Sequence, residues 1–299
     1  MNLHRLRIFR AVVEHQSFSQ AAELLFMTQP SVSLQVRALE RQLGVQLLFR
    51  QGRRMCPTEA GQVVYEYARG VLTETDELVR TLRELQGARA GQVRVGASTS
   101  ALYRLVPAVC RFQAQHPGAQ LQVHAGAAHE VCQRVLQGEL DLGLIVADRV
   151  PVGLLVEQAA EEDIVLVGAP SHPLFRRSRL SLAVLGQERF VLPPAGTGLR
   201  PILDAQLTAL GVAHGPIALE LNSNEGIKLA VDQGLGLAFF VRCAVAADLA
   251  AGRFRALAVP GLRLHATLHL VRRPRRYLSP LLQALLTHLR GELRSPLPG

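Results

Sequence analysis

The segment TQPSVSLQVRALERQLG, residues 28–44, has the pattern of a helix with one apolar stripe and one polar face. Thr28 can cap it, Pro30 is tolerated in a first turn because it lacks an N–H, and Gly44 can end it. The stripe, at spacings of four, three and four, consists of Val32, Val36, Leu39 and Leu43. The polar face carries short or planar hydrogen-bonding groups that can reach base edges or phosphates. These groups belong to Gln29, Ser31, Ser33, Gln35 and Arg37.

Two further helices are predicted before this segment. Apolar residues at helical spacing, with arginines between them, indicate a first helix of about 12 residues. Its apolar stripe consists of Leu3, Leu6, Phe9 and Val13. Ser17 and Ser19 can cap a short second helix, whose Ala21 and Ala22 permit close approach of a neighbour. Two helices joined by a short turn, the second one exposed and polar, form the motif that inserts into a major groove.

A hairpin is predicted after the third helix. Residues 45–49 are expected to form a strand, residues 50–54 a turn, and residues 55–57 the returning strand. Arg50, Arg53 and Arg54 at its tip can contact phosphates or a minor groove. The alternative is that these arginines belong to an ordinary solvated turn. With the hairpin, residues 1–57 form an all-α winged helix-turn-helix domain.

The net charge of +9 is unevenly distributed along the 299 residues. Residues 1–57 carry eight arginines and three acidic residues, whereas residues 91–262 are neutral. Residues 263–299 carry seven arginines and one glutamate. A basic N-terminal unit joined to a larger neutral unit is typical of a nucleic-acid reader with a second module. The C-terminal arginines at 272, 273, 275 and 276 fit a solvated turn, with a second nucleic-acid contact as the alternative.

A long helix is predicted from Thr58 to about Leu85. Its small or apolar residues alternate at spacings of four and three: Val64, Ala68, Val71, Thr75, Leu78, Leu82 and Leu85. Such a heptad seam, on a helix of ~42 Å at about 1.5 Å per residue, favours pairing with a second copy of the chain. The alternative is a long helix packed on its own domain. Residues 58–90 would then form a dimerising linker, with a hinge at residues 86–91.

The remaining residues, 91–299, predict an α/β ligand-binding domain. Strands are expected at residues 92–97, 120–125 and 140–146, and helices at residues 102–115 and 129–137. This alternation predicts a mostly parallel sheet with helices on its faces.

Three helix starts in this domain carry hydroxyl or amide groups. The first follows Ser98, Thr99 and Ser100, the second follows residues 193–198, and the third follows residues 222–224. Free backbone N–H groups and the helix dipole favour an anion at such positions. We therefore predict a cleft for a small anionic ligand such as a carboxylate. The alternative is that the hydroxyls at 98–100 merely cap their helix.

Other classes of protein find little support in the sequence. Its apolar runs are far shorter than the ~20 residues of a membrane span, and the start lacks a signal-peptide pattern. We therefore expect a cytoplasmic protein. The four cysteines show no metal-ligand spacing, which predicts reduced thiols and no metal site. Neither catalytic residues nor a cofactor are expected, because no common catalytic motif occurs. A solute-binding or enzymatic α/β protein, the alternative class, would leave residues 1–85 unexplained.

The N-terminal motifs together resemble those of LysR-type transcriptional regulators. The resemblance runs from Leu3 to Gly61 and is densest at residues 19–22, 28–33, 47–50 and 57–61. The long helix resembles the linker helix of that family. Residues 91–299 resemble its effector domain, a two-lobed fold similar to periplasmic binding proteins. The stretches 193–200 and 222–240 look most like regulators of carbon fixation or of sulfur and nitrogen assimilation.

The resemblance implies lobes and partners. One lobe would comprise residues 91–160 and 268–299, and the other residues 161–267. A homodimer or homotetramer would bind an interrupted inverted repeat in double-stranded DNA. A small-molecule effector would reorient the lobes and so alter DNA bending and the recruitment of RNA polymerase.

The resemblance also implies site residues. The residues that face DNA would be Thr28, Gln29, Pro30, Ser31, Ser33, Gln35 and Arg37, with Arg53 and Arg54 in the wing. The residues that bind the effector would be Ser98, Thr99, Ser100, Thr197, Gly198 and Ser223.

Overall fold

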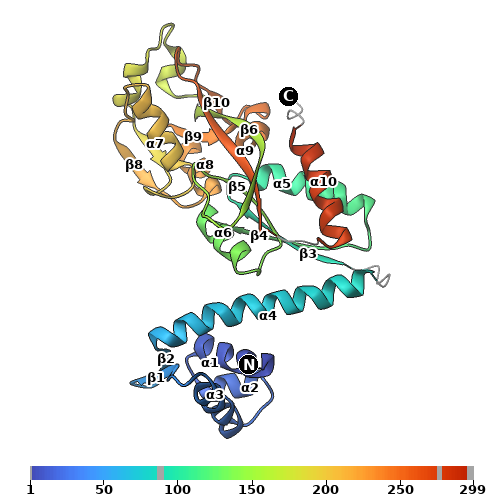
Figure 1. The fold of residues 1–299 in the computed structure, drawn as a ribbon. Helices are drawn as coiled ribbons and strands as arrows, with labels where there is room; N and C mark the ends of the chain where they lie inside the picture. The colour runs from blue at the N-terminus through green and yellow to red at the C-terminus, as the bar shows by residue number, and fades with distance from the viewer. Residues whose placement is uncertain (1, 86–90, 275–277, 295–299) are drawn as a thin grey trace. The chain divides into compact units, whose positions relative to one another are not determined.

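The computed structural model describes residues 2–85, 91–274 and 278–294 (Figure 1). The chain divides into two compact units, Met1–Arg83 and Glu84–Gly299. Each unit has a hydrophobic core of its own. Apart from Gly91, the predicted hinge at residues 86–91 lies outside the described residues, as do Arg275 and Arg276.

The first unit begins with three helices, α1 (Leu3–His15), α2 (Phe18–Leu24) and α3 (Gln29–Leu43). Ser17 and Thr28 cap α2 and α3 as predicted, and Gly44 ends α3 in the left-handed conformation. Ser19 lies inside α2 and does not cap it.

The apolar stripes of these helices are confirmed only in part. Val32, Val36 and Leu39 of α3 are buried in the core. Leu3 and Leu43, which were expected in the buried stripes, are exposed because they lie at helix ends beyond the core.

The hairpin is present but lies later in the chain than predicted. Its strands are β1 (Leu48–Gln51) and β2 (Arg54–Pro57), paired antiparallel. The prediction of a strand from Val45 was wrong because residues 44–47 form the turn that closes α3. The Glu40 carbonyl accepts hydrogen bonds from the N–H groups of Gly44 and Val45, and its carboxylate accepts from Leu47 and Leu48. Arg50 therefore lies in a strand, and the turn contains Arg53.

The long helix α4 spans Glu59–Leu85, close to the prediction. Thr58 starts it, since its Oγ1 accepts a hydrogen bond from Gly61 N–H at 3.0 Å. A Cβ at Gly61 would lie 1.9 Å from the Leu47 carbonyl oxygen. Only glycine therefore allows α4 to begin this close to the hairpin.

The predicted heptad seam of α4 was partly wrong. Ala68, expected in the seam, is buried with Leu72 in the core of the first unit, because this half of the helix packs on its own domain. The alternative reading thus holds for the first half of α4. Leu78 and Leu82 of the seam are exposed. Together with exposed Val63 and Tyr67 they form an exposed α4 stripe, consisting of Val63, Tyr67, Leu78 and Leu82.

The second unit contains a seven-stranded mixed sheet in the order β10-β6-β11-β5-β3-β4, with β9 also paired to β6. Its strands are β3 (Gln92–Ser98), β4 (Gln120–Gly126), β5 (Leu142–Val146), β6 (Leu155–Gly168), β9 (Ala238–Val241), β10 (Arg255–Ala256) and β11 (Leu264–Arg272). Only β3 pairs in parallel, with β4 and β5. The three strands predicted from the sequence therefore pair in parallel as expected. The sheet as a whole is mixed and not mostly parallel, because the long strands β6 and β11 carry the chain out to the second lobe and back and so run antiparallel.

Helices cover both faces of this sheet (Figure 1). Helices α5 (Leu102–Gln115) and α10 (Pro280–Arg294) pack on one face, and α6 (Ala128–Leu136) packs on the other. Alternate residues of β5 contact the two layers: Leu144 and Val146 belong to the core under α5, and Ile145 to the core under α6.

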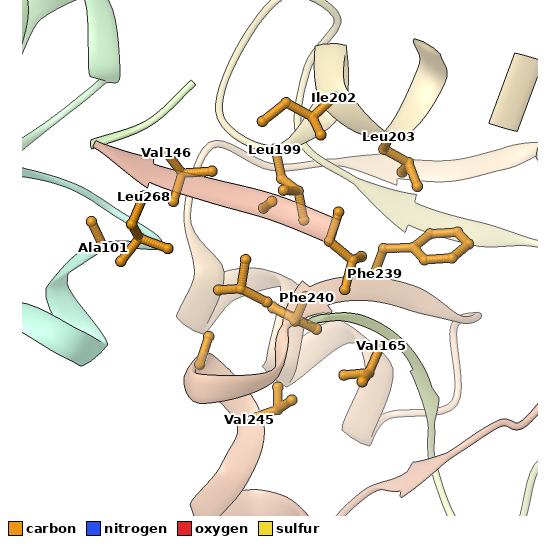
Figure 2. Packing of buried hydrophobic residues seen from close by; sticks show 14 of the residues in the cluster. Ala101, Val146, Val165, Leu199, Ile202, Leu203, Phe239, Phe240, Val245 and Leu268 are labelled. Atoms are coloured by element: carbon orange, nitrogen blue, oxygen red, sulfur yellow. The ribbon is translucent and has the colours of Figure 1, made fainter. Parts of the chain in front are cut away.

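The second lobe is built from the remaining elements of this unit. These are η1 (Pro173–Arg176), η2 (Leu182–Gly186), β7 (Phe190–Leu192), α7 (Arg200–Ala209), β8 (Ile217–Glu220), α8 (Asn224–Asp232) and α9 (Arg242–Ala250). Strands β7 and β8 form a separate parallel pair. One hydrophobic cluster passes through both lobes: Figure 2 shows it from Ala101 and Leu268 at one end to Ile202 and Phe239 at the other. Among the described helices, none is long and apolar enough to cross a membrane.

Candidate nucleic-acid interface and ligand cleft

Helix α3 presents a polar surface on the side away from its buried stripe. Gln29, Pro30 and Arg37 are exposed, and Ser31 and Ser33 are half-buried. Thr28 is exposed, and its Oγ1 accepts the hydrogen bond from Ser31 N–H that caps the helix. Side chains of these types can hydrogen-bond base edges and phosphates.

Two residues of α3 differ from the simple picture of a polar face. Gln35 is half-buried, and its Oε1 accepts a hydrogen bond from the Arg5 guanidinium at 3.2 Å, so its oxygen is already occupied. Leu34, which the polar pattern did not include, is 58% exposed on α3. An exposed apolar side chain on such a helix can contact a thymine methyl group.

The arginines of the first unit fall into two groups. On α1, Arg7 forms an ion pair with Asp76 at 2.8 Å, and Arg10 pairs with Glu14. In contrast, the five arginines of α3 and the hairpin form no ion pair with any described carboxylate: Arg37 and Arg41 on α3, and Arg50, Arg53 and Arg54 in the hairpin. Their positive charge is therefore available to a polyanion.

The hairpin is fixed to the rest of the first unit. The Met55 N–H donates to the Gln16 carbonyl at 2.9 Å, which ties β2 to the end of α1. Arg53 and Arg54 are exposed, and Arg50 Nε donates to the Gly52 carbonyl within the turn. A basic hairpin held beside a helix-turn-helix has the composition of a wing that contacts the DNA backbone.

The second unit contains a cavity of about 230 Å³ where the ends of β3 and β5 meet the loops of the second lobe. Four of the six predicted effector residues line it: Ser98, Thr99, Ser100 and Gly198. Glu130 and Asn222 also line it, and neither was among the predicted residues.

The three hydroxyls at the end of β3 have different roles. The Ser98 Oγ accepts a hydrogen bond from Val146 N–H at 2.9 Å, which ties β3 to β5. Ser100 is 7% exposed and lines the cavity. Helix α5 has no side-chain cap, so the alternative that Thr99 and Ser100 merely cap it is wrong. Both hydroxyls are free to bind a ligand.

Thr197 and Ser223 lie differently from the prediction. Thr197 lines neither this cavity nor the cavity next to it. Its Oγ1 donates a hydrogen bond to the Pro194 carbonyl within its own turn. Ser223 caps α8 by accepting from Gly226 N–H, and lines a neighbouring cavity.

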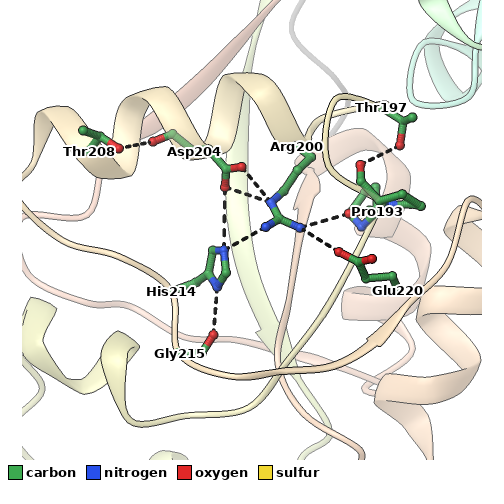
Figure 3. Close-up of polar contacts among 9 residues, drawn as sticks. Pro193, Thr197, Arg200, Asp204, Thr208, His214, Gly215 and Glu220 are labelled. Atoms are coloured by element: carbon green, nitrogen blue, oxygen red, sulfur yellow. Dashed lines mark hydrogen bonds and ion pairs between the residues drawn. The ribbon is translucent and has the colours of Figure 1, made fainter.

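Buried Arg200 holds the turn at residues 193–198 in place (Figure 3). Its guanidinium donates to the Pro193 carbonyl at 3.1 Å and to the Asp204 carboxylate at 2.8 Å. It also contacts His214 Nε2 at 3.0 Å and Glu220 at 3.5 Å. Arg200 therefore positions Gly198 at the cavity without lining the cavity itself.

The neighbouring cavity, about 520 Å³, shares Thr99 and Asn222 with the first and continues between the starts of α5 and α8. Tyr103 of α5 donates from its hydroxyl to Glu225 of α8 at 2.8 Å, which bridges the two lobes. Lys228 donates to the same carboxylate and pairs with buried Asp248 at 3.1 Å. The Lys228 hydrogen bond holds the pKa of Glu225 below its usual range, while burial raises the pKa of the Tyr103 hydroxyl.

The residues of the candidate cleft that the sequence missed come from distant parts of the chain. Tyr103, Glu130 and Glu225 carry no motif of their own. Asn222 belongs to the predicted helix start at residues 222–224, although it was not among the predicted effector-binding residues, and Glu225 directly follows that start.

Two family models match the chain. The model described as "Bacterial regulatory helix-turn-helix protein, lysR family" matches residues 3–62, and "LysR substrate binding domain" matches residues 86–294. The chain belongs to the LysR family. It is therefore a DNA-binding transcriptional regulator with an effector-binding domain, and not an enzyme. Among the described residues of this LysR-family protein, no group of three His, Cys, Asp or Glu could hold a metal ion.

Its relatives include regulators named for RuBisCO. The chain is 34% identical over 284 residues to a "Probable RuBisCO transcriptional regulator" of Cyanidioschyzon merolae (strain NIES-3377 / 10D), with 93% of each chain covered. It is 31% identical to the "RuBisCO operon transcriptional regulator" of Allochromatium vinosum, over 94% of this chain and 92% of that one.

Solved structures share the fold of this LysR-family protein. Full-length CbnR complexed with its target DNA superposes with a TM-score of 0.69 at 22% identity, over 98% of this chain and 100% of that one. ArgP from Mycobacterium tuberculosis gives a TM-score of 0.73 at 20% identity, over 97% of this chain and 96% of that one. The predicted fold class, a winged helix-turn-helix followed by a two-lobed α/β domain, is confirmed.

Proposed function

We propose that this LysR-family protein regulates genes of carbon fixation, such as a RuBisCO operon, in response to a small metabolite that carries a carboxylate. The names of its relatives support the choice of target genes. The site observation that carries the proposal is the cavity at the start of α5, which Thr99 and the 7% exposed Ser100 line together. The Ser100 hydroxyl, next to Thr99 and a helix N-terminus, suits a ligand carboxylate.

DNA binding is assigned to α3 and the hairpin. The residues proposed to face DNA remain Thr28, Gln29, Pro30, Ser31, Ser33, Gln35 and Arg37, with Arg53 and Arg54 in the wing. The five arginines without carboxylate partners support this surface, because each phosphate contact releases counterions.

The regulator acts as a dimer, or as a dimer of dimers, on an interrupted inverted repeat. The exposed α4 stripe supports pairing, because apolar side chains on a long helix gain stability when a second helix covers them. Effector binding between the lobes then changes their relative orientation, which alters DNA bending and the recruitment of RNA polymerase. The protein does this in the cytoplasm and uses no cofactor.

Footprinting with the full-length protein on the region upstream of its own gene and of RuBisCO genes tests DNA binding. We expect specific protection that is lost in Gln29→Ala and Arg53→Ala. Arg177→Ala is the matched control, because Arg177 is an exposed arginine of the second unit. No specific protection on any genomic fragment would refute the regulator function.

Calorimetry with carboxylate metabolites tests the cleft. Binding should be lost in Thr99→Ala and retained in Thr197→Ala, since only Thr99 lines the cavity. An unchanged affinity in Thr99→Ala would remove this residue from the site.

A further inference from the structure

The charge of the effector cavity is unusual for an anion site. Glu130 is the only charged residue among the described residues that line it. The other lining groups are hydroxyls, an amide, glycines and small apolar side chains. A ligand with only negative charge would enter this cavity beside a carboxylate, with no lining Lys or Arg to offset the repulsion.

Glu130 is an exposed residue that lines the cavity at its rim and is held there by the start of α6. It lies in the first turn of α6, where its Oε2 accepts a hydrogen bond from Ala127 N–H at 2.9 Å. Its Oε1 has no hydrogen-bond partner among the described residues. A Cβ at Gly126 would lie 3.0 Å from Oε2, so glycine leaves room for the carboxylate. One oxygen thus holds the side chain, and the other is available to a ligand donor.

The second acidic residue of the cleft is already satisfied. Glu225, in the neighbouring cavity, accepts hydrogen bonds from Tyr103 and Lys228. A positive group on a ligand would therefore be drawn to Glu130. The cavity volume of about 230 Å³ is below the roughly 300–1,000 Å³ of sites for drug-sized ligands, which favours a compact ligand.

We propose that the effector is a small amino acid. Its carboxylate binds the Thr99 and Ser100 hydroxyls at the start of α5, and its ammonium group binds the carboxylate of Glu130. The ligand then brings one charge of each sign, and the ammonium balances the acidic lining. This inference rests on the proposed function, because it names the class of effector for that same cleft.

Matched pairs of amino and hydroxy acids test the inference on the full-length protein. Suitable pairs are L-alanine with L-lactate, L-serine with L-glycerate, L-aspartate with L-malate, and γ-aminobutyrate with 4-hydroxybutyrate. Calorimetry should show at least one amino acid binding roughly tenfold or more tightly than its hydroxy partner, which is the scale of one charge-assisted hydrogen bond.

Glu130→Gln isolates the charge of this residue. The amide oxygen of glutamine can still accept from Ala127 N–H, so the start of α6 is kept. We expect the preference for the amino member to disappear in Glu130→Gln. Glu139→Gln, changed just after the same helix and outside the cavity lining, should keep it. Ser100→Ala should weaken both members of a pair by a similar factor, since it removes the carboxylate contact.

Three outcomes overturn the inference: no amino acid binds, the hydroxy acids bind as tightly, or Glu130→Gln keeps the preference. The last would leave Glu130 with a capping role only. None of these refutes the proposed regulator, whose failure would appear instead as absent DNA protection. Circular dichroism and thermal unfolding of each variant confirm that its second unit is folded.

Discussion

The pKa and the reactivity of single side chains in this regulator depend on their surroundings as well as on their residue type. Cys243 and Cys132 illustrate this for thiols. Burial, together with the nearby carboxylate of Glu162, raises the pKa of the Cys243 thiol to about 12, and burial raises that of Cys132 to about 11. Both are protonated near neutral pH and poorly nucleophilic. Cys110, in contrast, is exposed.

We predict that a thiol reagent labels exposed Cys110 fastest in the native protein, labels half-buried Cys56 and Cys243 more slowly, and labels buried Cys132 only after unfolding. Mass spectrometry of the labelled peptides checks the order. Cys110→Ser should remove the fast phase of the reaction. Rapid labelling of Cys243 in the folded protein would show that its surroundings are open, contrary to the structure.

His269 on β11 is expected to make the free energy of unfolding depend on pH. Burial lowers its pKa from the ordinary 6.5, and its Nδ1 is buried without a hydrogen-bond partner among the described residues. The unfolded chain therefore takes up the proton at a higher pH than the native chain. The contribution of neutral His269 is complete above about pH 6.5 and is lost as the pH falls through the lowered pKa.

We predict that the free energy of unfolding falls on acidification below about pH 6.5, and falls less steeply in His269→Gln. Urea denaturation at a series of pH values measures both slopes. His129→Gln, at an exposed histidine of α6, is the matched control and should keep the wild-type slope. Identical slopes for His269→Gln and wild type would refute the assignment.

At the scale of elements, Arg200 links three segments of the second lobe: the turn at 193–198, helix α7 and strand β8 (Figure 3). The side chain is buried, whereas its partners Asp204 and Glu220 are over 40% exposed and can be hydrated without it. Loss of Arg200 should therefore release the turn more than it unfolds the domain.

We predict that Arg200→Met lowers the free energy of unfolding by about 1–3 kcal/mol and weakens effector binding, because Gly198 is no longer held at the cavity. DNA binding without effector should be unchanged. Arg177→Met, at an exposed arginine, controls for loss of charge. Wild-type effector affinity in Arg200→Met would show that the turn holds its position by other contacts.

Helix α4 is the second element whose role depends on its surroundings. Its buried side at Ala68 and Leu72 packs on the core of the first unit, and its exposed stripe at Tyr67 and Leu78 is the surface that we propose for pairing with a second copy. We predict that Tyr67→Glu and Leu78→Glu each weaken dimerisation at least tenfold, because a charge would be buried in the pair. Sedimentation equilibrium measures this. Gln62→Glu, at an exposed residue of the same helix outside the stripe, should leave the dimer intact.

At the scale of the whole molecule, the excess arginines fall into two groups, those without a described carboxylate partner and those that form ion pairs within the fold. The arginines of α3 and the hairpin have no described carboxylate partners, as shown above. The basic C-terminal segment is used in part for packing: Arg290 of α10 makes a bidentate contact with Glu157 of β6, which lowers the pKa of that carboxyl. A net charge of +9 therefore overstates the charge that DNA meets.

We predict that operator affinity falls steeply with salt and that Arg53→Ala reduces the slope of log affinity against log salt by about 1. Arg263→Ala, at an exposed arginine of the basic C-terminal segment, should leave the slope unchanged. Fluorescence anisotropy over a salt series gives these slopes. A reduced slope in Arg263→Ala would contradict the prediction and show that the second unit also contacts DNA.

The sequence by itself determined the DNA-binding motif and the family. Thr28, Pro30 and Gly44 mark the bounds of α3 because caps and turns act within a few residues, and Val32, Val36 and Leu39 mark its buried side. The alternation of strands and helices likewise predicted most elements of the first lobe. These signals are local, so they can be read without knowing which distant segments meet.

Only the tertiary structure decided which side of α4 is buried. It also decided that Ser100 lines the cavity whereas Thr197 does not, and that Glu130 is the charged residue among the described lining residues. The cavity joins residues 98–100, 125–130, 198 and 222, which lie far apart in the chain and carry no shared pattern. In the sequence Glu130 is an ordinary residue for a helix start, since a carboxylate there satisfies a free N–H. Folding places it in the same cavity lining as the hydroxyls at the end of β3, and this proximity is the basis for the part in ligand choice that we propose for its carboxylate.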